Sequence, residues 1–282
     1  MSKNKSLKWQ AISKLNSMAA YGQSKHADKL QNHGKPAGNK IYSHSTMQNY
    51  QAVATQFTTW ARETHGCRTL DEAQAHTGEY LAQREAAGCS AWTVRRDAAA
   101  LGKLYQVPTT ALGHGLPTRH RGDVTQHRTA PKEFREANHK DLADLCRSCG
   151  LRRSEVAALR PQDVRMEGGR CLVTVTQGKG GKARVVPALD NTPARLAQEA
   201  AAAGRDRVVE HIPVRAPVHA WRADYAQRLY DNIARPVVIV PPSERYHCRG
   251  DRAGTCYDKR AMQQVSEALG HSRLDVVTSY IK

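Results

Sequence analysis

The sequence predicts a mainly α-helical protein with a small β-hairpin or sheet in a second, α+β domain. Apolar residues recur every three or four positions through much of the chain, which is the period of a helix face. Two short β-branched runs, at 170–176 and 183–187, flank the segment Gln-Gly-Lys-Gly-Gly-Lys, a pattern typical of a hairpin. The 282 residues and a hydrophobic content of 40% fit one large or two modest folded domains.

The chain carries a strong excess of positive charge. It has 43 Lys and Arg against 26 Asp and Glu, a formal net charge of +17. A surface this basic attracts polyanions, so we expect a nucleic acid partner. The N-terminus lacks the apolar run of a signal peptide, and no stretch approaches the roughly 18–20 apolar residues of a membrane span. The composition therefore predicts a cytoplasmic protein with reduced cysteines and no membrane partner.

Residues 1–44 are predicted to form a basic N-terminal arm. The only acidic residue from Met1 to Arg62 is Asp28, against nine Lys and Arg. Such a segment is either a solvated tail or an arm that lies on a phosphate backbone, and both interpretations stay open.

Residues 45–107 are predicted to be a helical, DNA-binding domain. Three helices are expected in this block. The second of them opens at Thr69, which has capping-box spacing to Glu72, and ends at Gly88. Ser90 can cap the third helix. The first helix presents one apolar face, made of Met47, Tyr50, Val53, Phe57 and Trp60. The polar side of the third helix carries three candidate DNA-binding residues, Arg95, Arg96 and Lys103.

Residues 108–136 are predicted to be a linker, because prolines mix with Gly, Thr and His there and the helical period fades. Residues 137–282 form the second predicted domain. We expect five helices in it. The first covers Asp141–Ser148 and stops at Gly150, the second begins after the cap Ser154, and the third begins at Thr192. The last two cover Val218–Ile233 and Asp258–Leu269.

Four motifs stand in a fixed order in this second domain. Gly150-Leu151-Arg152-Arg153-Ser154-Glu155 lies between two helices, and Gly178-Lys179-Gly180-Gly181-Lys182 lies in the hairpin. A His-x-x-Arg follows, and Leu269-Gly270-His271 precedes Tyr280 by nine positions. This ordered set resembles the tyrosine recombinases, the phage-type integrase family, over roughly residues 137–282. The helical block before it fits the family's SAM-like core-binding domain by position and type.

The resemblance implies a role for each motif residue. Arg152 and a second arginine would bind the non-bridging oxygens of a scissile phosphate as guanidinium forks, with Glu155 supporting the site. Lys179 would protonate the leaving 5′-oxygen. His271 would bind the phosphate or help Tyr280 lose its proton. Tyr280 would be the nucleophile that forms a 3′-phosphotyrosine. Lys182 is a further candidate DNA contact.

Two positions compete for the second arginine. His219 and Arg222 form a literal His-x-x-Arg whose side chains share a helix face, but this choice requires an insertion at about 234–257. Arg249 stands at the family's distance from His271, but it ends a His-x-Arg rather than a His-x-x-Arg and lies in a stretch that resembles a loop or second hairpin. We favour His219 and Arg222, and expect Arg249 to be a DNA-contacting or surface residue.

The resemblance also implies partners: double-stranded attachment-site DNA, four protomers at a synapse, accessory DNA-bending proteins and a location in a bacterial cytosol or nucleoid. Two other classes remain open, a catalytically inactive DNA-binding relative and a DNA-relaxing enzyme like the type IB topoisomerases. No nucleotide fingerprint is present and Cys146-x-x-Cys149 lacks two further ligands, so we expect no cofactor, no metal and buried thiols. Family members often continue beyond the nucleophile into a docking segment, so we expect either a different assembly or a loosely held Tyr280.

Overall fold

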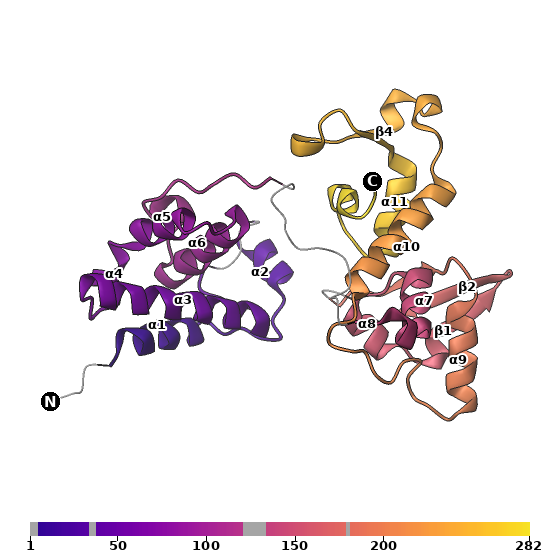
Figure 1. Ribbon diagram of the computed structural model, residues 1–282, viewed down its shortest axis with the longest axis horizontal. Coiled ribbons are helices and arrows are strands. Elements are labelled where there is room, and N and C mark those ends of the chain that lie inside the picture. The colour runs from indigo at the N-terminus through magenta and orange to yellow at the C-terminus, as the bar shows by residue number, and fades with distance from the viewer. Residues whose placement is uncertain (1–4, 34–37, 121–133, 179–180) are drawn as a thin grey trace. The chain divides into compact units, whose positions relative to one another are not determined.

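The computed structural model describes residues 5–33, 38–120, 134–178 and 181–282. The chain divides into two compact units, Met1–Thr125 and Gln126–Lys282, which Figure 1 shows in indigo to magenta and in rose to yellow. Each unit has its own hydrophobic core. Within the described ranges, no helix is both long enough and apolar enough to cross a membrane.

The first unit is a helical bundle. Ser43, Thr69 and Ser90 each accept a backbone N–H in the first turn of the helix that follows, as good N-cap residues do. The predicted apolar face is confirmed, since Phe57 lies at the centre of the core. The helices are α1 (Leu7–Asn16), α2 (Lys25–Gln31), α3 (His44–His65), α4 (Leu70–Gln74), α5 (Thr77–Ala86) and α6 (Ala91–Tyr105).

Two features of this unit differ from the predictions. The basic N-terminal segment contains α1, whose Leu7, Ala11 and Leu15 are buried against α3, so this part is neither a solvated tail nor a free arm. The helix predicted from Thr69 to Gly88 is two helices, with a break at Ala75 and His76. At the break the Thr77 hydroxyl donates both to the carbonyl of Gln74 and to that of Leu112, 35 positions away, so a tertiary contact holds the chain where the two helices separate.

The second unit combines helices with two small antiparallel sheets, which confirms the predicted fold class. Its helices are α7 (Lys140–Cys149), α8 (Arg153–Ala158), α9 (Thr192–Ala202), α10 (Val218–Ile233) and α11 (Lys259–Ala268). One sheet has the order β1 (Val164–Glu167), β2 (Arg170–Val175), β3 (Arg184–Pro187), and the other pairs β4 (Arg245–His247) with β5 (Cys256–Asp258). The hairpin of β2 and β3 was predicted, whereas β1 was not.

Helix α10 holds the second unit together by packing against both α7 and α11 (Figure 1). Helix α7 ends at Gly150, which has a φ of 57°. A Cβ at this position would overlap the ring of Tyr225 on α10, with its Cγ only 2.7 Å away. Glycine is therefore required both by the left-handed backbone and by the close approach of the two helices. The ends of α7 and α11 both reach Arg222, near the start of α10, through the carbonyls of Gly150 and Leu269.

Candidate active site

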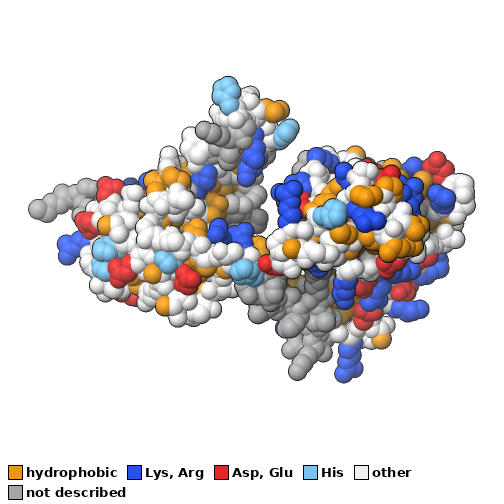
Figure 2. Space-filling model, turned by 90° about the horizontal axis from the view of Figure 1, so that it is seen from above, with side chains coloured by type: hydrophobic (Ala, Val, Ile, Leu, Met, Phe, Trp, Pro, Cys, Tyr) orange, Lys and Arg blue, Asp and Glu red, His pale blue; other side chains and the backbone are white. Residues whose placement is uncertain are grey.

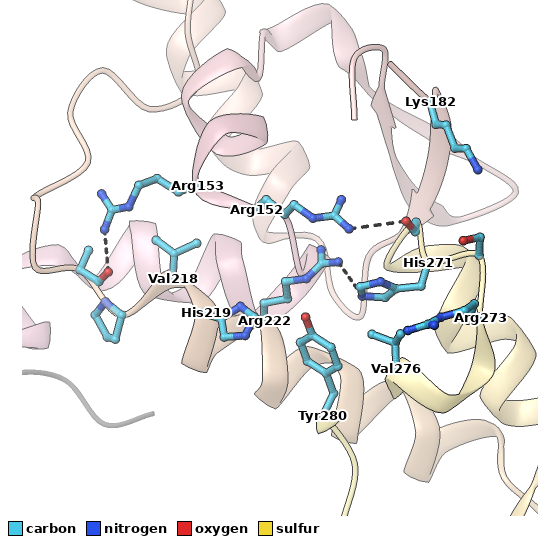
Figure 3. A pocket seen from close by; sticks show the side chains of 14 residues that line it. Arg152, Arg153, Lys182, Val218, His219, Arg222, His271, Arg273, Val276 and Tyr280 are labelled. Carbon is cyan, nitrogen blue, oxygen red and sulfur yellow. Dashed lines mark hydrogen bonds between the residues drawn. The ribbon is translucent and has the colours of Figure 1, made fainter. Parts of the chain in front are cut away.

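A pocket of about 820 Å³ opens where these helix ends meet (Figure 3). Five of the six residues predicted to be catalytic contribute side chains to it, from the start of α8, the start of α10 and the segment after α11. Arg153 also lines the pocket, but its guanidinium turns away to the carbonyls of Pro213 and Ala216. The predicted residues brought together here are Arg152, His219, Arg222, His271 and Tyr280.

Arg222 is the most deeply buried of these side chains, with an exposed fraction of 1%. Its guanidinium donates to the carbonyl of Gly150, at the end of α7, and to the carbonyl of Leu269 at 2.5 Å, at the end of α11. Helix C-termini carry partial negative charge, so they stabilise a buried cation without a carboxylate. Burial lowers the pKa of Arg222 to about 10, and repulsion from Arg152 acts in the same direction. The group is still charged at neutral pH, in a setting that favours an added anion.

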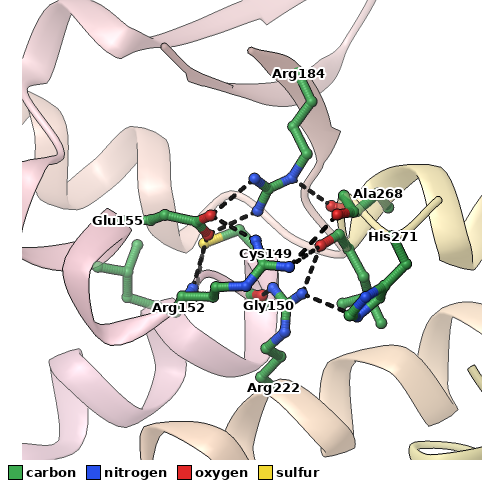
Figure 4. Close-up of polar contacts among 11 residues, drawn as sticks. Cys149, Gly150, Arg152, Glu155, Arg184, Arg222, Ala268 and His271 are labelled. Carbon is green, nitrogen blue, oxygen red and sulfur yellow. Dashed lines mark hydrogen bonds and ion pairs between the residues drawn. The ribbon is translucent and has the colours of Figure 1, made fainter. Parts of the chain in front are cut away.

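Glu155 ties two further arginines into the site (Figure 4). Its carboxylate accepts from the Arg152 guanidinium at 2.7 Å and from both Nη atoms of Arg184 at 2.7 and 2.9 Å. Burial alone would raise the pKa of Glu155, but the hydrogen bonds from Arg184 and Arg152 lower it to about 2. The carboxylate also accepts from the backbone N–H of Arg152, so Glu155 caps α8 and the prediction of Ser154 as the cap was wrong.

The three guanidiniums surround one carboxylate and a set of backbone carbonyls. Arg152 donates to Leu269 O at 3.0 Å, and Arg184 donates to Ala268 O at 2.9 Å. Three positive charges therefore face one negative charge within this cluster, and the carbonyls supply only dipoles. The cluster is suited to a doubly or singly charged anion in the pocket, where guanidinium forks match the oxygens of a phosphate.

Arg184 was missed as a site residue by the sequence reasoning, although it stood in the predicted β-branched run at 183–187. The available signal was its position in β3, two positions before the buried Val186 and so on the same face of the strand, at the edge of the glycine-rich segment. Its partners lie 29 and 84 positions away, so only the folded chain reveals them.

His271 and Tyr280 reach the pocket from the end of the chain. His271 follows Gly270, which has a φ of 65° and lies against the Arg184 side chain, and its Nε2 is 3.5 Å from Arg222 Nη2. The ring of Tyr280 has its centroid 5.5 Å from that of His271 and 5.4 Å from that of His219. In Figure 3 its hydroxyl points toward Arg222, whose Cζ is 5.8 Å from the ring centroid.

The remaining predicted residues of this unit lie elsewhere or outside the description. Lys179 falls outside the described residues. Lys182 lines the pocket and is exposed. Arg249 is exposed in the connection between β4 and β5 and does not line the pocket. Of the two candidates for the second arginine, Arg222 is the one that lies beside Arg152.

The predicted DNA-binding residues of the first unit contact their own chain. Arg95 donates to the carbonyl of Pro117 at 2.7 Å, and Lys103 donates to the carbonyl of Gly38 at 2.7 Å. Arg96 pairs with the buried carboxylate of Asp97 and is half exposed. Figure 2 shows further Lys and Arg side chains spread over the visible surface of the second unit, with hydrophobic side chains between them.

Two other groups have the residue types of metal ligands. In the described part of the chain, donor atoms of His65, His76 and Glu79 lie within 4.8 Å of one another. The two imidazole rings stack at 3.7 Å with an interplanar angle of 13°, so their in-plane lone pairs do not converge on one point in this arrangement. Cys146 and Cys149 are fully buried as thiols, and burial raises the pKa of Cys146 to about 12.

The sequence matches two family models. Residues 37–110 match the description "Phage integrase, N-terminal SAM-like domain", and residues 124–232 match "Phage integrase family". Together these ranges cover well over half of the chain, and the protein belongs to the tyrosine recombinase, or phage integrase, family, whose members bind DNA in recombination and integration. The second range contains Arg152 and Arg222 but ends before His271 and Tyr280. No curated protein has a sequence that matches this chain.

Several solved structures resemble this chain at low sequence identity, and two of them, with TM-scores above 0.5, share its fold. A post-cleavage complex of the XerH site-specific recombinase bound to palindromic difH substrate has a TM-score of 0.56 and 15% identity, covering 98% of this chain and 90% of XerH. A pre-cleavage complex of XerH with difH has a TM-score of 0.51 and 16% identity, with 97% and 90% covered. The Tn1549 transposon integrase in complex with circular intermediate DNA has a TM-score of 0.48 and 13% identity, with 91% and 93% covered.

Proposed function

We propose that this protein is an active site-specific DNA recombinase that cleaves and rejoins DNA through a 3′-phosphotyrosine. One observation carries the proposal: two arginines, two histidines and a tyrosine from distant parts of the sequence converge on one pocket. Three of these residues, Arg152, Arg222 and His219, lie inside the range that matches the integrase family.

The scissile phosphate of a DNA strand occupies this pocket in the proposed complex. Arg152 and Arg222 donate to its non-bridging oxygens, and their charges stabilise the additional negative charge of the pentavalent transition state. Both side chains are already held by Glu155 and by helix-end carbonyls, so little reorganisation is needed when the phosphate binds. The proposal requires no metal ion, because the guanidiniums supply the positive charge.

Cleavage then exchanges one phosphoester bond for another. The Tyr280 oxygen loses its proton to a neighbouring histidine, for which His271 is the candidate, and forms a bond to phosphorus. The bond from phosphorus to the 5′-oxygen breaks, and that oxygen takes a proton from Lys179, the proposed general acid. The product is a 3′-phosphotyrosine and a free 5′-hydroxyl. Religation is the reverse step with a 5′-hydroxyl from another strand.

The proposed substrate is duplex DNA that carries specific attachment sites. The two XerH structures of similar fold hold difH substrate, and the net charge of +17 suits a long polyanion. By family analogy, the proposal extends to four protomers at a synapse in a bacterial cytosol or nucleoid. Lys182 and Arg249 are proposed contacts to the DNA backbone.

Covalent capture tests the proposal without knowledge of the target site. Duplexes from a randomised pool carry a nick just downstream of each possible scissile phosphate, so that the short fragment with the 5′-hydroxyl dissociates and the adduct accumulates. We expect an SDS-resistant protein–DNA adduct that is lost in Tyr280→Phe and kept in the control Tyr21→Phe, a tyrosine of the first unit.

Two other outcomes separate the competing classes. DNA binding without an adduct from any pool would indicate an inactive DNA-binding relative. Relaxation of supercoiled plasmids irrespective of their sequence, dependent on Tyr280, would indicate a DNA-relaxing enzyme.

A further inference from the structure

The main chain that follows Tyr280 is held in place by three contacts. The Ile281 side chain lies in the core of the second unit, called the catalytic unit from here on, and has an exposed fraction of 1%. The N–H of Lys282 donates to Gln227 Oε1 at 2.8 Å. The carbonyl of Ile281 accepts from Arg252 Nη1 at 3.0 Å. The expectation of a loosely held Tyr280 is therefore not met, because contacts within the same chain fix the residues beside it.

Arg252 makes its contact from a hairpin segment, defined here as residues 234–258. The base of this segment is fixed to α10: the Tyr257 ring packs edge-on against Tyr230 with centroids 5.7 Å apart, and the Asp258 N–H donates to the Tyr230 hydroxyl at 2.9 Å. Arg252 Nη1 also lies 3.2 Å from the Tyr257 hydroxyl, so the buried Tyr257 orients the guanidinium. The segment thus connects the last turn of α10 to the main chain beside Tyr280.

We propose that Arg252 is a positioning residue for the nucleophile: it fixes the main chain beside Tyr280 and thereby orients the phenol toward the phosphate pocket. A hydrogen bond from a guanidinium to a carbonyl is charge-assisted and stronger than a neutral one. A displacement of about 1 Å at a reacting atom can lower a rate about 100-fold. The inference rests on the proposed function, because it assigns Arg252 a part in the reaction of Tyr280.

The first arm of the test measures chemistry. In single-turnover adduct formation at saturating nicked DNA, we expect Arg252→Ala to lower the rate about 10- to 100-fold with an unchanged Kd for DNA. Arg252→Lys can still donate to the carbonyl of Ile281 and is expected to recover most of the rate. The matched control is Arg245→Ala, which removes an equivalent 2.8 Å bond to the carbonyl of Val240 within the same segment. A weakened Kd with an unchanged rate at saturation would make Arg252 a DNA contact and overturn the proposal.

The second arm measures the anchoring itself and needs no activity. Hydrogen exchange of the peptide covering residues 274–282 is expected to accelerate in Arg252→Ala and in Gln227→Ala, but not in Arg245→Ala. If the wild-type protein forms no adduct, the proposed function fails while this arm still decides whether Arg252 holds the segment. Unchanged exchange in Arg252→Ala, or accelerated exchange with an unchanged adduct rate, would overturn the positioning role.

Discussion

Replacing Glu155 by glutamine tests the charge balance of the arginine cluster. The substitution keeps the size of the side chain and removes the carboxylate that Arg152 and Arg184 share. The folded protein lowers the pKa of Glu155 from 4.5 to about 2, a shift that corresponds to about 3 kcal/mol of stability at neutral pH. We therefore expect Glu155→Gln to lower the free energy of unfolding of the catalytic unit by about 3 kcal/mol at pH 7, because its guanidiniums remain buried without their counter-charge.

The same reasoning fixes the sign of a pH dependence. A carboxylate whose pKa is lowered by folding stabilises the protein fully above its unfolded pKa, and this contribution disappears as pH falls through the folded pKa. The wild type should therefore lose about 1.4 kcal/mol of this contribution by pH 3.5, relative to pH 7, and all of it below pH 2. The difference in free energy of unfolding between wild type and Glu155→Gln should therefore be smaller by about 1.4 kcal/mol at pH 3.5 than at pH 7.

The assay must isolate the catalytic unit, because two units do not give one unfolding transition. Hydrogen exchange of α7 and α10 peptides across a urea series gives the free energy for this unit alone. Glu199→Gln is the matched control, since Glu199 is 48% exposed in its pair with Arg195 and should change the free energy by about 0.5 kcal/mol or less. A loss below about 1 kcal/mol in Glu155→Gln at pH 7, or a gap that stays constant down to pH 3.5, would refute the reasoning.

Two further predictions follow from the same geometry. Arg222→Ala should abolish the covalent adduct, whereas Arg249→Ala should keep it and only weaken DNA binding and its salt dependence. Gel-shift titrations at several salt concentrations measure the binding, and the opposite result would make Arg249 the second arginine. Gly150→Ala should destabilise the catalytic unit by about 2 kcal/mol or more, because the new methyl group meets the Tyr225 ring at a left-handed backbone position. Exchange of the α10 peptides would measure that loss, and Gly168→Ala, whose φ is 56° in open space, separates the backbone strain from the clash.

Local signals explain which elements could be predicted from the sequence. Helix α10 was predicted with its observed bounds because its apolar stripe is long, and α7 because glycine at 150 is a strong stop. The split between α4 and α5 and the burial of α1 were not predictable in this way. Both depend on contacts with residues far along the chain, and a lysine-rich segment conceals the short apolar stripe of α1.

The candidate site shows the same division between local pattern and tertiary contact. The motifs predicted Arg152, His271 and Tyr280 and favoured Arg222 over Arg249 as the second arginine, and the fold brings these four residues to one pocket. The motifs gave no indication of how these side chains are held. The carbonyls that hold the arginines belong to helix ends about 50 to 120 positions away, and the ends meet only when α10 packs against both helices.

The choice of hydrogen-bond acceptors explains why the site keeps its positive charge. A carboxylate holds a guanidinium firmly but also neutralises it, whereas a helix-end carbonyl holds it and leaves the charge available. Glu155 pairs with Arg152 and Arg184, while Arg222 is hydrogen-bonded to the carbonyls of Gly150 and Leu269. The lowered pKa of Arg222 reflects a buried charge that its surroundings compensate poorly. A phosphate beside Tyr280 would compensate the charge of Arg222. The desolvation cost of burying Arg222 therefore favours binding of the phosphate that the proposed nucleophile, Tyr280, would attack.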